Sequence, residues 1–126
     1  MTTLDHDILA FIRASIRSVW ALELLLLLRA HPDRSWSSEE LISELRASTP
    51  LVGETVTVLS TAGLIRTDAD GRHTYAPASP ALAALCDRLQ SLYRERPVRV
   101  VNAIVSSSGD KLQNFADAFR LKGEPK

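Results

Sequence analysis

The sequence predicts a mainly α-helical fold with one small β-hairpin, and three observations lead to this prediction. Apolar residues recur at helical spacing over most of the chain. Serine and proline stand repeatedly at positions that typically begin helices. One Asp-Gly pair, Asp70-Gly71, follows a short β-rich run and is typical of a hairpin turn. With 126 residues and a mass of 13.9 kDa, residues 1–126 are expected to form a single domain.

The N-terminal part of the chain predicts helical structure up to a proline. A helix is expected over residues 4–17, running up to or into the next apolar segment. Residues 19–28 are apolar on most faces, which predicts the central core helix. This segment is much shorter than the roughly 20 residues that span a bilayer, and Glu23 interrupts it, so no membrane partner is expected. His31-Pro32-Asp33 closes the helix, because a residue before proline avoids the helical conformation.

Two further helices are predicted between Ser37 and Gly63. Ser37 is a candidate N-cap, and Glu40 stands three residues later, which completes the pattern of a capping box. Ser48-Thr49-Pro50 ends this helix and begins the next, since proline is favoured in a first helical turn. Ala62-Gly63 ends the second helix. Its inner face is expected to consist of Leu51, Val52, Val56, Val58 and Leu59.

The hairpin is predicted directly after the second helix. Residues 64–67 form the first strand, residues 68–71 the turn, and residues 72–76 the return strand. Ser35-Trp36 is expected to pair with the hairpin as a further short strand. Residues 18–76 therefore form the predicted core unit.

The C-terminal part predicts helices that begin at prolines. Ser79 and Pro80 begin a helix that ends near Tyr93, with Leu82, Leu85, Leu89 and Leu92 on its apolar face. The β-branched run after Pro97 fits either a short helix or a buried strand, and we favour the helix. A loop over 106–109 and a last helix are expected to follow. The helices within 79–121, together with 4–17, are expected to be packing or dimerisation extensions.

The order of these elements resembles the winged helix-turn-helix transcriptional regulators of the MarR-like superfamily. The resemblance rests on SSEEL at 37–41 and VTVLSTAGLIR at 56–66, and it covers roughly residues 18–76. It implies a small bacterial-type homodimer whose second motif helix enters the major groove while the wing grips the backbone. The residues expected at DNA are Ser48, Thr49, Thr55 and Thr57 on that helix and Arg66, Arg72 and His73 on the wing.

Charge leaves a second hypothesis open. Fifteen basic residues balance fifteen acidic ones, and the pI is about 6.8, whereas nucleic-acid binders are usually basic. Between Ser48 and Ala62, Glu54 is the only charged residue, and the Arg, Lys, Asn and Gln side chains that read base edges are absent. The chain is therefore either a DNA-binding regulator that contacts mainly phosphates or a winged-helix module that binds another protein.

A further basic patch is a candidate phosphate or acidic-partner site, or simply a set of charges that favour helix ends. Its residues are Arg13, Arg17, Arg94, Arg96 and Arg99.

The sequence contains no pattern of an enzyme or of a cofactor site. His6, His31 and His73 are scattered, and no metal-ligand spacing or phosphate-binding loop accompanies them. We expect no metal and no cofactor. Cys86 is the only cysteine, which excludes an internal disulfide and favours a cytoplasmic protein with a buried, inert thiol.

Overall fold

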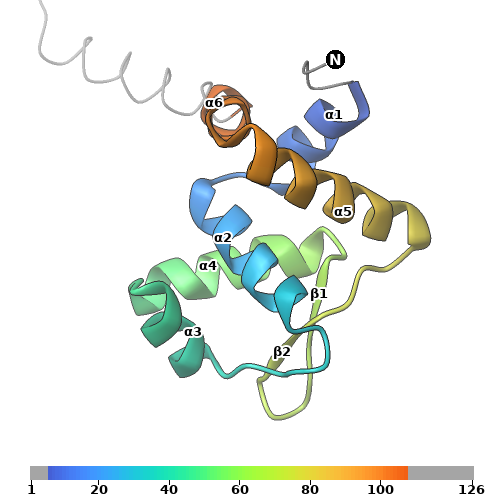
Figure 1. The fold of residues 1–126 in the computed structure, drawn as a ribbon. Helices are drawn as coiled ribbons and strands as arrows, with labels where there is room; N and C mark the ends of the chain where they lie inside the picture. Colours follow the sequence, from blue (N-terminus) through green and yellow to red (C-terminus); the bar gives the residue numbers. More distant parts are fainter. Residues whose placement is uncertain (1–5, 108–126) are drawn as a thin grey trace, which may run out of the picture.

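The structure is a computed structural model and describes residues 6–107. Within this range it contains α1 (His6–Ser15), α2 (Val19–Ala30), α3 (Ser38–Leu45), α4 (Thr49–Thr61), β1 (Ile65–Thr67), β2 (His73–Tyr75), α5 (Pro80–Glu95) and α6 (Pro97–Ser107). Figure 1 shows α2 in the middle of the molecule, with α1, α5 and α6 at one end and α3 and the hairpin at the other. The prediction of a mainly helical fold with a small hairpin is confirmed.

Helices α1 and α2 are separate, so the expected N-terminal helix runs up to the apolar segment that begins at Val19 and not into it. Ser18 has an extended backbone, with φ −160° and ψ 163°, and its Oγ accepts a hydrogen bond from the Ala21 amide at 3.0 Å. This cap begins a new helix rather than continuing the first. Ile12 and Ile16 on either side of the α1 end are both fully buried, so the apolar periodicity runs across the break and conceals it.

Helix α2 is the central core helix, as predicted. Leu22, Leu25 and Leu28 are completely buried, and each contributes on the order of 1.5–3 kcal/mol by leaving water. The helix ends at Ala30, and His31 follows as its C-cap. Among the helices that the structure describes, none is both long and apolar enough to cross a bilayer.

The caps of α3 and α4 are those predicted. Ser37 Oγ accepts from the Glu40 amide at 3.0 Å, and Glu40 Oε1 accepts from the Ser37 amide at 2.9 Å, which completes the capping box. Ser48 Oγ accepts from the Leu51 amide at 3.3 Å at the start of α4. The inner face of α4 differs from the prediction: its buried residues are Val52, Thr55 and Leu59, whereas Leu51, Val56 and Val58 are partly buried.

The hairpin forms at the predicted place, with both strands shorter than expected. The register places Ile65 opposite Tyr75 and Thr67 opposite His73. Trp36 joins the hairpin through one bridge, in which its amide donates to His73 O at 2.8 Å and the His73 amide donates to Trp36 O at 2.7 Å. The predicted pairing of Ser35-Trp36 with the hairpin is thus confirmed, as a single bridge.

The β-branched run after Pro97, for which helix and strand were both open, is a helix. Helix α6 packs against α1 and α5 and buries Val100 and Ile104. The loop expected over 106–109 is wrong at its start, because Ser106 and Ser107 belong to α6. The helix expected after residue 109 lies outside the described residues.

Candidate nucleic-acid interface

The exposed face of α4 presents small polar side chains and a single charge. Ser48, Thr49 and Thr57 are exposed, as a role in contacting DNA requires. Thr57 Oγ1 donates to the Gly53 carbonyl at 3.0 Å, so its hydroxyl proton is already used within the helix. Glu54 is the charged residue of this face. The face can approach a partner closely, but it offers one negative charge and no cation.

Thr55 does not belong to this face, which corrects the sequence prediction. Its side chain is only 5% exposed, and its Oγ1 donates to the Leu51 carbonyl at 2.7 Å. Thr55 stands three residues after Val52 and four before Leu59, so it shares the inward face with these two residues. That spacing was visible in the sequence, but the hydroxyl suggested a surface position.

His73 is also buried and cannot grip a phosphate. Its ring nitrogens lie 3.0 Å from Ser38 Oγ and 2.8 Å from Thr67 Oγ1, so the ring links the hairpin to the start of α3. Burial lowers the pKa of His73, and the carboxylate of Asp68 opposes this only in part. Burial therefore favours the neutral ring, and its contacts with Ser38 and Thr67 give it a structural role, which corrects its assignment as a DNA contact.

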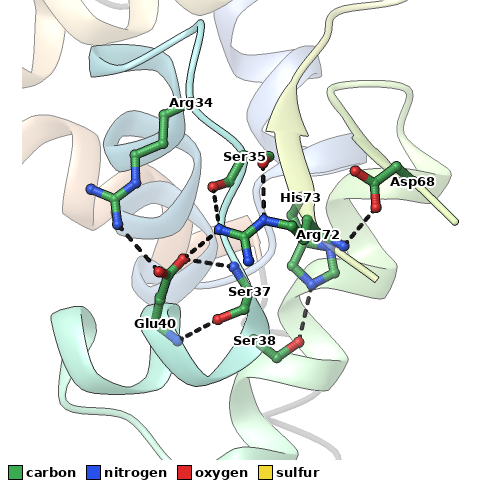
Figure 2. A network of polar contacts seen from close by, with 8 residues as sticks. All are labelled: Arg34, Ser35, Ser37, Ser38, Glu40, Asp68, Arg72 and His73. Atoms are coloured by element: carbon green, nitrogen blue, oxygen red, sulfur yellow. Dashed lines mark hydrogen bonds and ion pairs between the residues drawn. The ribbon is translucent and has the colours of Figure 1, made fainter. Parts of the chain in front are cut away.

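Arg72 is held by the protein itself. Its Nε donates to Ser35 Oγ at 3.0 Å, while Nη2 donates to Ser35 O at 3.0 Å and to Glu40 Oε1 at 3.1 Å (Figure 2). The Ser37 amide, with Arg72 and Arg34 nearby, holds the pKa of Glu40 below its ordinary value. The guanidinium of Arg72 is thus already paired, and its role as a phosphate contact is weakened accordingly.

Asp68 stabilises the hairpin turn in the same region. Its Oδ1 accepts from the backbone amides of Asp70 at 2.9 Å and Arg72 at 3.0 Å. These two donors lower the pKa of Asp68, with the larger effect from Arg72. The tip of the hairpin consequently carries a firmly ionised carboxylate, which repels a phosphate backbone.

Two arginines within residues 33–76 remain available to a partner. Arg66 on β1 is exposed, as predicted, and forms no ion pair or hydrogen bond through its side chain with the residues described. Arg46 is equally exposed at the C-cap of α3, where its backbone is left-handed with φ 55°. Arg46 was not among the predicted contacts, because it lies two residues before Ser48 and belongs to the end of the preceding helix.

The whole region around α4 is nevertheless acidic. Residues 33–76 contain four arginines and seven carboxylates, a formal charge of −3 with histidine neutral. Arg34 and Arg72 both lie against the same carboxylate, that of Glu40, at 3.7 and 3.1 Å. Arg34 also stacks over the Trp36 ring, 3.5 Å from its centroid. The positive charge left for an external anion is therefore small.

The further basic patch predicted from the sequence does not lie on the same surface as the exposed face of α4. Arg94, Arg96 and Arg99 are exposed around the junction of α5 and α6, and Arg13 is exposed on α1. Figure 1 shows these helices at the end of the molecule opposite to the hairpin. Arg17 differs from these four arginines in position, because it lines a hollow beside α4.

Neither a metal site nor a relative identifies the function. Among the described residues, no three His, Cys, Asp or Glu side chains gather as metal ligands do. No protein-family model, no curated protein and no solved structure is similar enough to this chain to count as a match.

Proposed function

We propose that this chain is a winged-helix protein that acts by binding another protein through the exposed face of α4. The order of α2, α3, α4 and the hairpin, with Trp36 bridged to the hairpin, supports the winged-helix assignment. The charge of residues 33–76 carries the functional part of the proposal. A surface with seven carboxylates and two arginines free of carboxylate partners suits a protein partner better than a phosphate backbone.

The chemistry of α4 supports the same conclusion. Pro50, Gly53 and Thr57 are exposed and small, so a partner's backbone can come close to this helix. Base-edge recognition rests on Arg, Lys, Asn and Gln, and α4 contains none of them. Glu54 and the carboxylates around the helix favour a partner with basic side chains, because complementary charge selects the correct partner. A role in the transcription or signalling machinery fits such a module.

Site-specific crosslinking tests this proposal. A photoreactive residue at Thr57 should capture one partner in cells, whereas the same group at Ala84, exposed on α5, should not. The purified partner should bind the wild type, and Thr57→Arg should weaken that binding at least tenfold. Ala84→Arg, which adds the same charge on the exposed side of α5, serves as the matched control and should bind normally. Equal capture at Thr57 and Ala84, or unchanged binding by Thr57→Arg, would reject the α4 face as the interface.

A DNA-binding regulator is the second candidate, and the exposed positions of Arg46 and Arg66 favour it. With these two cations and the hydroxyls of Ser48 and Thr49, contacts would be mainly to phosphates. Two phosphate contacts imply a slope of about −2 in log K against log salt. Fluorescence anisotropy with a nonspecific duplex measures this slope, and the double variant Arg46→Ala/Arg66→Ala should abolish binding.

The same titration separates the two candidates. Binding with the stated slope, lost in the double variant, would replace the protein-binding proposal with the DNA-binding one. No binding at the lowest salt would eliminate the DNA candidate. Thr57→Arg adds a cation to α4, so it should strengthen DNA binding but weaken protein binding, which gives the two functions opposite responses to one substitution.

We further propose a homodimer that forms along α6. Val98 is 70% exposed and Val105 47% exposed, and Val101 stands between them at the three-and-four spacing of a coiled-coil seam. The same spacing continues in the sequence at Leu112, Phe115 and Phe119, which lie outside the described residues.

Light scattering tests the dimer. The wild type should have twice the monomer mass of 13.9 kDa, and Val98→Glu should return it to the monomer. Ser106→Glu, exposed on the same helix but outside the seam, is the control and should remain dimeric. A monomeric wild type, or dimers of equal stability in Val98→Glu, would reject this interface.

A further inference from the structure

A hollow of about 290 Å³ lies between the start of α2 and the side of α4. Ligand pockets usually measure about 300–1,000 Å³, so this one suits a small molecule of few carbon atoms. Arg17 and Ala21 line it from the α2 side, and Leu51, Glu54, Thr55 and Val58 line it from α4.

Two opposite charges line this hollow without pairing. Arg17 and Glu54 are both exposed, and within residues 6–107 neither forms an ion pair with the other or with a third residue. A guanidinium binds a carboxylate through two parallel hydrogen bonds, and a carboxylate accepts from an ammonium group. A single ligand that carries both groups would satisfy both side chains.

The remaining lining separates a polar part from an apolar part. Ala21, Leu51 and Val58 provide aliphatic surface. Thr55 is buried, and its hydroxyl donates to the Leu51 carbonyl, so the hydroxyl oxygen can still accept a hydrogen bond from a ligand. The hollow therefore combines one cation, one anion, one buried acceptor and an aliphatic wall.

We infer that this hollow binds a free α-amino acid with an aliphatic side chain, of which L-leucine is the representative. The carboxylate lies on Arg17, the ammonium group on Glu54 and Thr55, and the side chain on the aliphatic wall. Glu54 also belongs to the exposed face of α4, so a bound ammonium neutralises the one charge of that helix. Binding of the amino acid thereby alters the electrostatic character of the face proposed to meet a partner.

NMR titration of the full chain with L-leucine tests the inference, without any partner or DNA present. We expect saturable shifts of the Leu51, Glu54 and Val58 amides, with Kd on the order of 1 mM for so small a ligand. Glycine should bind at least tenfold more weakly, because each buried methylene contributes about fourfold in affinity. L-leucinamide lacks the carboxylate and N-acetyl-L-leucine lacks the ammonium group, so both should also bind at least tenfold more weakly.

Three variants complete the experiment. Arg17→Gln and Glu54→Gln should each lower the affinity for L-leucine at least tenfold, whereas Arg13→Gln, exposed on α1 and outside the hollow, should not. All three are surface changes whose folding a melting curve verifies. The inference is overturned by the absence of shifts up to about 10 mM L-leucine, by equal binding of L-leucinamide, or by unchanged affinity in both hollow variants. Because no partner takes part, either result leaves the proposed function to its own tests.

Discussion

Arg72 in the hairpin donates to Glu40 Oε1 at 3.1 Å, and that same oxygen accepts the backbone N–H of Ser37 at 2.9 Å. One carboxylate therefore serves both as the capping-box acceptor of α3 and as the anchor of the hairpin (Figure 2). This relationship explains why the Arg72 guanidinium is turned toward the protein and is not free for an external phosphate. It also makes Glu40 a structural residue although it lies at the surface.

Substitution of Glu40 should destabilise the protein more than substitution of its neighbour. Glu40→Ala removes the reciprocal cap and leaves Arg72 without its carboxylate, whereas Glu39→Ala changes an exposed first-turn residue. Ser37→Ala removes one capping bond and should cost about 1 kcal/mol. Urea unfolding measures the free energies. Equal losses in Glu40→Ala and Glu39→Ala would contradict the shared role of this carboxylate.

The free energy of unfolding should decrease as the pH is lowered through the range in which histidine titrates. Burial lowers the pKa of His73 below 6.5, so the unfolded chain binds a proton more readily than the folded one. The stabilisation is present above pH 6.5 and is lost as pH falls through the lower folded value. Glu40 and Asp68 have lowered pKa values as well, and their contributions are lost only in the acid range, below about pH 4.5.

Urea midpoints at pH 7.5, 6.5 and 5.5 measure this dependence. His73→Gln should flatten it, because the variant lacks the buried imidazole. A slope that is the same in the wild type and the variant would show that His73 is not its source.

Two glycines should respond in opposite directions to alanine. Gly63 has φ +80°, and an added Cβ would lie 3.3 Å from Ala78 Cβ, so Gly63→Ala should cost about 1–3 kcal/mol. Gly53 lies inside α4 with nothing within 4 Å of an added Cβ, so Gly53→Ala should stabilise by about 0.5–1 kcal/mol. Thermal unfolding compares them, and a shift of the same sign in both variants would contradict the geometry.

The thiol of Cys86 should be unreactive in the folded protein. It is completely buried, and burial raises its pKa, which reduces the thiolate that attacks disulfide reagents. An aromatic disulfide reagent at pH 8 should label it only when denaturant is added. Rapid labelling of the native protein would show that α5 opens far more often than its packing implies.

Much of the fold follows from local chemistry that the sequence displays. Ser37 with Glu40, Ser79 with Pro80, and Asp70-Gly71 each determine a helix start or a turn through contacts within a few residues. Two features did not follow in the same way. A continuous apolar stripe left open whether the first helix ends before Ser18, and the β-branched run after Pro97 fits either a helix or a strand, although the helix was favoured.

The sequence by itself determined the element types, their order and the weak base-reading chemistry of α4. Only the tertiary structure decided which candidate side chains are exposed. Thr55 and His73 are buried because α2 and α3 cover them, and Arg17 lies near Glu54 although 37 positions separate them. Capping and turn bonds span at most a few residues, whereas exposure depends on contacts between distant segments, which no local pattern records.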